Sequence, residues 1–371
     1  MQEYIIVARS GRSLAVSAKR AGYNVHVLDC YADVDTRESS VTFKQLHYTE
    51  NGFSESELLE SVLAILSDHP DAIVVIGSGF EINPYLIKQL NEITTVYSND
   101  ADVICALKNP ETLFPLMDRC GINYPETFLT LPEISDNYLA KKIASMGGEG
   151  IHWAGKITDK SRHDYYFQKY VDGTVCSVVF LADGRHSKIV GFNHLLQSNQ
   201  FESMPFLYGG VCSREVNDQH YDEIKIIINS LVKETGLKGL CGIDYVLTDD
   251  NKIYVLEVNP RPPASFELHE QTESLFDMHL ACFNGDLEKY ALQRCYGIRA
   301  CAILYANFNL LIPRDFVWPD WVSDIPVAGA RIKRHEPVCS VHAEEDSLLK
   351  INEVLKSRRE QIEQQLTRLK I

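Results

Sequence analysis

Residues 254–261 read Tyr-Val-Leu-Glu-Val-Asn-Pro-Arg, and this stretch is the most informative part of the chain. Side chains alternate between the two faces of an extended segment, so Glu257 and Asn259 point the same way. An earlier strand pattern covers residues 243–247 and is followed by a polar turn. The two patterns predict a β-hairpin that brings Asp244 beside Glu257.

Such a hairpin would present two carboxylates and one amide on one face. Magnesium prefers oxygen ligands and accompanies phosphates, so we predict a Mg²⁺ site formed by Asp244, Glu257 and Asn259. Mn²⁺ is a second ion that these ligands would accept. Arg261 follows on the same face, where its guanidinium suits a phosphate. The alternative for this stretch taken alone is an acidic hairpin at a sheet edge.

The composition is that of a globular protein with more than one subdomain. The 371 residues include 36 basic and 51 acidic ones, a net charge of −15, which disfavours nucleic acid as a partner. The cysteines form no CxxC pair and no zinc-type spacing, which indicates free thiols in a reducing cytoplasm. The N-terminal residues resemble neither an export signal nor a membrane anchor.

The first hundred residues alternate strand and helix patterns, which predicts a parallel βαβ layer. The expected strands cover residues 5–8, 25–29 and 72–76, and the expected helices cover residues 13–21, 54–67 and 84–92. The loop at residues 77–81 follows the third strand, at the edge where open α/β sheets hold ligands. We therefore expect Ser78, Phe80 and Glu81 at a substrate edge. No GxGxxG motif follows the first strand, so a dinucleotide fold is not favoured.

The remainder of the chain is expected to be helical first and then mainly antiparallel. Residues 100–125 read as a helical linker that contains Lys108, and an α+β body with short alternating strands begins near residue 137. The tail comprises a strand-rich piece over residues 300–343 and a long polar helix over residues 347–369. The apolar seam of that helix either pairs with a second subunit or lies across its own body.

Two further segments suit a nucleotide. Residues 141–151 place Lys141 on a strand before a glycine loop, and the amides of Gly147 and Gly148 can bind phosphate oxygens. The alternative is an ordinary glycine hairpin with surface lysines. Residues 167–173 form an extended segment whose main chain can pair with the edge of adenine, although an ordinary strand end reads the same way.

The order of these segments resembles that of the ATP-grasp superfamily over nearly the whole chain. The resemblance implies a fold that is α/β plus α+β, with ATP held between two α+β lobes. It divides the chain into an N-terminal pre-ATP-grasp domain, a helical linker, a small lobe, a large lobe with the metal site and a C-terminal extension with a long helix, over residues 1–100, 101–136, 137–175, 176–299 and 300–371.

The resemblance also implies roles for individual residues. The nucleotide-binding residues would be Lys108, Lys141, Gly147, Gly148, Gln168, Lys169, Tyr170 and Val171. The metal ligands would be Asp244, Glu257 and Asn259, and the residues at the reacting phosphate would be Arg261 and Lys141. Two departures stand out. Val175 and Cys176 occupy the place of a ribose-binding glutamate, and Gly242 replaces the arginine of the D-alanine ligase branch.

A narrower resemblance rests on residues 77–81, 108–110, 257–263 with Ser265, and 318–326. These segments are similar to ATP-grasp proteins that accompany tetrahydromethanopterin- and methylofuran-linked one-carbon metabolism, a group similar to the ligases that join glutamate to tyrosine or tyramine. This resemblance implies amino acid substrates of that type. It adds Ser265 to the candidate substrate residues, and Arg214 is a candidate clamp for a substrate carboxylate.

We therefore expect an ATP- and Mg²⁺-dependent carboxylate-amine ligase that works through an acyl-phosphate. Its partners would be small-molecule carboxylates and amines, with a homodimer as one arrangement. The alternatives are a nucleotide-binding protein without turnover and a carboxylase-type ATP-grasp enzyme. His194, His269 and Glu81 are the residues that could deprotonate the amine, but a single histidine is more often a packing or surface residue.

Overall fold

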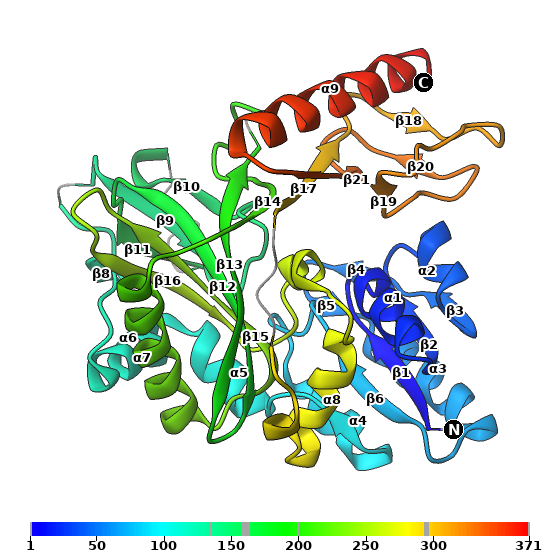
Figure 1. Cartoon of the computed structure of the whole chain (residues 1–371), viewed down its shortest axis with the longest axis horizontal. Helices are drawn as coiled ribbons and strands as arrows, with labels where there is room; N and C mark the ends of the chain where they lie inside the picture. The colour runs from blue at the N-terminus through cyan, green and yellow to red at the C-terminus, as the bar shows by residue number, and fades with distance from the viewer. Residues whose placement is uncertain (1, 134, 157–163, 199, 293–296, 370–371) are drawn as a thin grey trace.

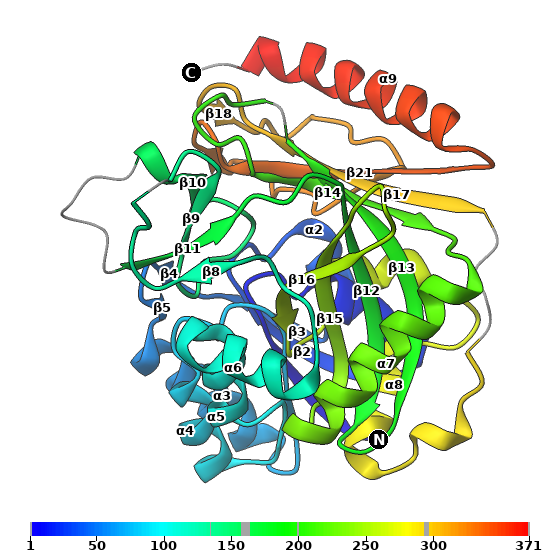
Figure 2. The same cartoon turned by 90° about the vertical axis from the view of Figure 1, so that its left-hand side faces the viewer.

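The computed structural model describes residues 2–133, 135–156, 164–198, 200–292 and 297–369. Within these residues the strands form three larger sheets and two two-stranded ribbons, as Figure 1 shows together with the helices. The N-terminal sheet lies beside the largest sheet, and the smallest of the three forms a separate lobe (Figure 2). The expected combination of a parallel N-terminal layer with antiparallel sheets elsewhere is confirmed.

The N-terminal sheet is parallel and has the strand order β3-β2-β1-β6-β7. Its strands are β1 (Glu3–Val7), β2 (Asn24–Asp29), β3 (Thr42–Gln45), β6 (Ile73–Ile76) and β7 (Val96–Tyr97). Its helices are α1 (Arg12–Arg20), α2 (Val34–Glu38), α3 (Glu55–Asp68) and α4 (Tyr85–Ile93), and a small ribbon joins β4 (Tyr48–Thr49) to β5 (Gly52–Phe53). Consecutive residues Ile5 and Ile6 are both fully buried, as expected for a parallel strand covered on both faces.

The expected helical linker consists of two helices, α5 (Ala101–Lys108) and α6 (Pro110–Cys120). They separate at Asn109, whose backbone is extended and whose side chain accepts a hydrogen bond from the amide of Glu111. Pro110 then occupies the first helical position, where its missing N–H costs nothing. This break places Lys108 at the C-terminal end of α5, beside the sheet that carries the hairpin of residues 238–259, called the metal hairpin below after its predicted ligands.

The small lobe is a four-stranded antiparallel sheet in the order β10-β9-β11-β8. Its strands are β8 (Thr127–Phe128), β9 (Tyr138–Lys142), β10 (Ile151–Trp153) and β11 (Tyr165–Lys169), and the 3₁₀ turn η1 (Ala154–Lys156) follows β10. In the central pair, β9 and β11 align Lys141 with Tyr166 and Ala140 with Phe167. The glycine loop connects β9 to β10 at one end of this sheet.

The largest sheet has eight strands in the order β16-β15-β12-β13-β14-β17-β21-β19. Its strands are β12 (Thr174–Asp183), β13 (Ser187–Gln197), β14 (Tyr208–Arg214), β15 (Lys238–Leu247), β16 (Ile253–Asn259), β17 (Ile298–Tyr305), β19 (Val322–Ser323) and β21 (Pro337–Glu345). β14 pairs with β17, so β17, β21 and β19 continue the sheet that contains the metal hairpin.

Helices cover both faces of this sheet. One face carries α7 (Asp218–Thr235), whose buried residues Ile224, Ile228 and Leu231 belong to the core beneath it. The other face carries α8 (Leu275–Asn284), which also contacts α1 and therefore lies between the large sheet and the N-terminal layer (Figure 1). The 3₁₀ segments η3 (Ala264–His269) and η4 (Leu287–Lys289) flank α8.

The C-terminal part ends in α9 (Leu348–Leu366), followed by η5 (Thr367–Leu369), and a ribbon joins β18 (Leu310–Leu311) to β20 (Arg331–Ile332). The seam residues Ile351, Leu355 and Ile362 are buried against β17 and β21, so the helix lies across its own body (Figure 1). This seam is not available to a second subunit. Among the described residues, no helix has the length and apolar character needed to cross a membrane.

Candidate active site

The predicted hairpin is confirmed by the pairing of β15 with β16. Asp244 lies directly opposite Glu257, and Gly242 lies opposite Asn259. The ladder is irregular just after Asp244, and the Nδ2 of Asn259 donates a hydrogen bond of 3.3 Å to the Oδ2 of Asp244. The structure therefore brings together the two carboxylates and the amide that were predicted to bind a metal ion.

The two carboxylates influence each other electrostatically. Burial and the neighbouring charge of Glu257 raise the pKa of Asp244 to about 7. Burial also raises the pKa of Glu257, but the ammonium of Lys108 outweighs it and holds that pKa below its usual range. Two mutually repelling carboxylates and an amide oxygen form an all-oxygen donor set, which fits Mg²⁺ better than an ion that prefers nitrogen or sulfur.

Lys108 lies at the hairpin itself. Its Nζ donates to Oε1 of Glu257 and, at 2.8 Å, to Oδ1 of Asn259. The side chain is only 7% exposed. This lysine was predicted to bind the nucleotide, and the structure places its ammonium against two of the predicted metal ligands.

Lys141 is held from two sides on β9. Its Nζ donates a hydrogen bond of 3.1 Å to Oε1 of Gln168, and it lies 5.7 Å from the ring centre of Tyr166. Gln168 is itself fixed because its Nε2 donates to Oγ1 of Thr127 at 3.1 Å. Gln168 therefore positions the lysine through its side chain, a contact that the sequence pattern did not indicate.

The expected adenine-binding segment has part of its main chain already paired. The amide of Lys169 donates to the carbonyl of Glu126, and the amide of Tyr170 donates to the carbonyl of Asn137, both at 2.8 Å. Within the part of the chain that the structure describes, the amide of Val171 has no such acceptor. Among the four residues predicted to bind adenine, Val171 is thus one whose N–H has no backbone acceptor within the described residues.

The two glycines of the loop have different surroundings. Both have positive φ values, +66° for Gly147 and +75° for Gly148. A Cβ on Gly148 would lie 1.9 Å from the carbonyl oxygen of Phe206, whereas a Cβ on Gly147 would meet nothing within 4 Å. The carbonyl of Gly147 accepts a hydrogen bond from the amide of Tyr208 at 2.8 Å. The loop is therefore docked against the large lobe.

A pocket that opens to solvent lies between the small lobe, the helical linker and the metal hairpin. Five predicted site residues line it, namely Lys108, Lys141, Gly147, Gly148 and Glu257. Its other walls come from Leu107, Pro110, Leu113, Phe114, Lys142, Ala144, Ser145, Ile151, Tyr166 and Leu256.

Arg261 is anchored by the N-terminal domain. Its Nε donates to Oε1 of Glu81 at 2.6 Å, and the other oxygen of Glu81 accepts from the amide of Gly79 at 2.8 Å. Burial raises the pKa of Glu81, but Arg261 and Lys108 outweigh it and hold that pKa below its usual range. A carboxylate stabilised in its charged form is a weak proton acceptor, so Glu81 is better suited to orient Arg261 than to act as a base.

Other residues predicted to contact substrate lie in different surroundings. Phe80 is 2% exposed and packs against Phe53 within the N-terminal core, because the loop turns its side chain inward. Ser78 accepts a hydrogen bond through its carbonyl from the amide of Arg9. Ser265 is buried in η3. Arg214 contacts the Sγ of Cys176 at 3.0 Å, so none of the four is joined to the metal hairpin by a direct contact.

The two histidines considered as bases are not placed among these groups. His269 is buried, and its Nε2 is 2.9 Å from Oδ1 of Asn193. Burial and the charge of Arg299 lower its pKa to about 4. Burial and Arg214 also lower the pKa of His194.

Comparison with known proteins identifies the domain. Residues 110–265 match the family model described as the ATP-grasp domain. A protein of Methanocaldococcus jannaschii, described as uncharacterized, is 23% identical over 368 residues, which covers 94% of this chain and 90% of that protein. The match places the linker helix α6, the glycine loop and the metal hairpin inside one domain of known type.

Two solved structures have the same fold over almost the whole chain. The biotin carboxylase domain of Hydrogenobacter thermophilus 2-oxoglutarate carboxylase has a TM-score of 0.74 at 13% identity, covering 96% of this chain and 89% of that one. An L-amino acid ligase from Bacillus licheniformis has a TM-score of 0.69 at 13% identity, covering 97% of both chains. The predicted ATP-grasp fold is therefore confirmed.

Proposed function

We propose that this chain, which carries an ATP-grasp domain on an ATP-grasp fold, is an ATP- and Mg²⁺-dependent carboxylate-amine ligase. One observation carries this proposal. The glycine loop and Lys141 of the small lobe line the same pocket as Lys108 and the metal-hairpin residue Glu257. Amides, ammonium groups and carboxylates that meet in one pocket suit a nucleotide triphosphate with its metal ion better than they suit an uncharged ligand.

In this proposal the nucleotide lies between the two lobes. The free amide of Val171 donates to the edge of adenine, and the apolar wall that includes Leu113 and Phe114 excludes water from the phosphate side of the pocket. Lys108 and Lys141 supply positive charge to the phosphates. The docking of Gly147 against Tyr208 holds the glycine loop over the site.

Asp244, Glu257 and Asn259 are the residues that would hold the metal ion. When bound, Mg²⁺ supplies charge neutralisation between the β- and γ-phosphates during transfer. Lys141 is fixed by Gln168, and Arg261 is fixed by Glu81, so neither cation needs to reorganise as charge moves.

The reaction consists of two transfers. A substrate carboxylate oxygen attacks the γ-phosphorus, the bond from that phosphorus to the β–γ bridging oxygen breaks, and ADP leaves. An amine nitrogen then attacks the acyl carbon, phosphate leaves, and the amine proton passes to solvent or phosphate. Positioning and charge neutralisation provide the catalysis, so the chain needs no nucleophile of its own.

For the substrates we propose an amino acid pair of the tyrosine and glutamate type. The segments at residues 77–81, 108–110, 257–263 with Ser265, and 318–326 support this finer proposal, because they resemble ATP-grasp proteins of methylofuran-linked one-carbon metabolism, a group similar to the ligases that join glutamate to tyrosine or tyramine. The site geometry itself supports the ligase chemistry, and it is the resemblance that supports the particular substrates.

The experiment is ADP release by the purified full chain with Mg-ATP, followed by the mass of the product. Tyrosine plus glutamate is compared with each amino acid alone, with a broad panel of carboxylates and amines, and with bicarbonate. An amide product that disappears in Glu257→Gln supports the ligase. ADP release that depends on bicarbonate instead would overturn it in favour of a carboxylase, and ATP binding without turnover on the whole panel would show a non-catalytic protein.

A further inference from the structure

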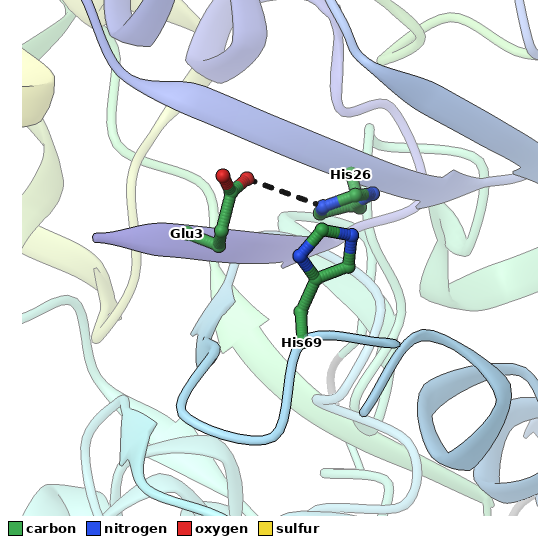
Figure 3. A group of neighbouring side chains, drawn as sticks. All are labelled: Glu3, His26 and His69. Carbon is green, nitrogen blue, oxygen red and sulfur yellow. Dashed lines mark ion pairs between the residues drawn. The ribbon is translucent and has the colours of Figure 1, made fainter. Parts of the chain in front are cut away.

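A second group of potential ligands lies in the N-terminal domain, away from the nucleotide pocket. Glu3 begins β1, His26 lies on β2, and His69 follows the last residue of α3. One ligand atom from each of the three side chains lies within 4.8 Å of the other two. Figure 3 shows the three side chains pointing toward one another from these separate elements.

The distance between the first two ligand atoms suits a bound metal ion. Oε2 of Glu3 is 3.3 Å from Nε2 of His26. Two ligands that are each about 2.0–2.1 Å from a tetrahedral zinc ion lie roughly 3.3 Å apart. Both atoms are buried, and apart from this ion-pair contact with each other neither has a hydrogen-bond partner among the described residues. A cation between them would satisfy both.

Both side chains are oriented by a second contact. The other carboxylate oxygen of Glu3 accepts a hydrogen bond of 3.0 Å from Nδ2 of Asn24. Nδ1 of His26 is 2.8 Å from Oγ1 of Thr42. When Nδ1 carries the proton and donates to Thr42, Nε2 presents its lone pair to the shared space, which is the arrangement of histidines that bind metals.

His69 completes the group from the opposite side. Its ring centre is 4.6 Å from that of His26, and its carbonyl accepts a hydrogen bond from the amide of Ala72, which fixes the turn between α3 and β6. The side chain of Gln2 donates to the carbonyl of Asp71 at 2.7 Å and ties the start of the chain to the same turn. One ring nitrogen of His69 lies within 4.8 Å of the ligand atoms of Glu3 and His26.

We propose that Glu3, His26 and His69 bind one divalent transition-metal ion of the zinc class, with water as the fourth ligand. Two imidazoles and one carboxylate suit such an ion, whereas Mg²⁺ and Ca²⁺ prefer oxygen alone. The ion would join β1, β2 and the end of α3, and so stabilise the N-terminal layer. The sequence contains no local spacing motif for this site, because its ligands come from three separate elements.

The test is a titration of the metal-free, tag-free full chain with Co²⁺, read by visible absorption. A four-coordinate site with imidazole ligands absorbs strongly, while an all-oxygen site absorbs weakly. We expect one strongly absorbing Co²⁺ per chain, displaced by Zn²⁺ and retained in Glu257→Gln. Glu3→Gln and His69→Gln are expected to weaken binding at least ten-fold. Thr42→Val removes a contact outside the ligand set and is expected to weaken it about ten-fold.

The matched control is His47→Gln. His47 and Glu57 also pair at 3.1 Å, but His47 is 87% exposed and has no third ligand, so its loss should leave the absorption unchanged. Zn²⁺ should also raise the melting temperature of the wild type and not that of Glu3→Gln. A missing Co²⁺ band, a band that persists in both Glu3→Gln and His69→Gln, or a band lost in Glu257→Gln would overturn the proposal.

Discussion

Two buried groups of charged residues contain the same types of side chain but differ in function. The hairpin cluster comprises Lys108, Lys141, Asp244, Glu257, Arg261 and Glu81. The Arg12 cluster comprises Arg12, Asp35, Glu267 and Asp324. In the hairpin cluster three carboxylates face three cations, and several of these groups line an open pocket. In the Arg12 cluster three carboxylates surround one arginine.

The Arg12 cluster joins three distant parts of the chain. The guanidinium of Arg12 on α1 is 2.5 Å from Glu267 on η3, 2.9 Å from Asp324 after β19, and 3.6 Å from Asp35 on α2. Asp35 also accepts hydrogen bonds from the amides of Asp324 and Ile325. We infer that the Arg12 cluster holds the fold together, whereas the hairpin cluster is arranged for a ligand, and four substitutions test this contrast.

The largest effect is expected on turnover when Glu257 becomes Gln. This change removes one anionic metal ligand and the partner of Lys108, so ADP release should fall by about 10²–10³-fold. The free energy of unfolding should change less than turnover, because Lys108 keeps the carboxylate of Asp244 as a nearby counter-charge. Asp35→Asn in the Arg12 cluster serves as the control and should retain turnover. ADP release within a few-fold of the wild type would contradict the assignment of the hairpin cluster.

Replacing Arg12 by Gln is expected to lower stability more than turnover, in contrast to Glu257→Gln. The free energy of unfolding should fall by about 2–4 kcal/mol, because Glu267 and Asp324 lose the cation that compensates their burial. Urea unfolding measures the loss. Arg20→Gln is the matched control, since Arg20 also pairs with a carboxylate but is 46% exposed and should cost less than about 1 kcal/mol. Equal losses from both substitutions would refute the special role of the Arg12 cluster.

A smaller effect on turnover is expected for Glu81→Gln. Glu81 anchors Arg261 through a 2.6 Å contact, and the neutral amide would hold the guanidinium less firmly. The kcat should fall about ten-fold while the KM for ATP stays close to that of the wild type, because Arg261 acts at the transferring phosphate. Steady-state kinetics separates the two parameters. A rise in KM with unchanged kcat would instead place Arg261 in ground-state binding of ATP.

The hairpin cluster also shows how much of the site the sequence determines locally. A period-two pattern and a polar turn were sufficient to predict the pairing of Asp244 with Glu257, because both features lie within one hairpin. The contact between Lys108 and Glu257 joins residues 149 positions apart, and no periodic pattern in the sequence predicts such a contact. The position of Lys108 near the site was predicted only from the order of motifs in the ATP-grasp resemblance.

The Arg12 cluster was not predicted at all. Arg12 begins α1, and its partners Glu267 and Asp324 lie 255 and 312 positions away. The same limit applies to α9, whose seam fits either a second subunit or its own sheet. Periodicity shows that a helix face is apolar, whereas tertiary packing decides what covers it, here β17 and β21.

The smallest effect is expected for Asp33, which lies beside the Arg12 cluster and forms no ion pair of its own within the described residues. Burial, Asp324 and Asp29 raise its pKa to about 9 from the ordinary value of 3.8. Between these two values the folded protein holds a proton that the unfolded chain has lost, so stability should decline as the pH rises. Asp33→Asn removes the titrating group and should add about 1–2 kcal/mol at pH 8 but little at pH 4.

Urea unfolding at pH 4, 6 and 8 tests this dependence as a difference between the variant and the wild type. The gain from Asp33→Asn should grow with pH, because only the wild type must bury a carboxylate that tends to ionise. Asp249→Asn, in the exposed turn of the hairpin, removes a carboxylate that is not buried and should leave the pH dependence in place. A gain that is constant across the three pH values would mean that Asp33 is already ionised in the folded protein. The excess negative charge of the Arg12 cluster would then be balanced by groups other than a proton.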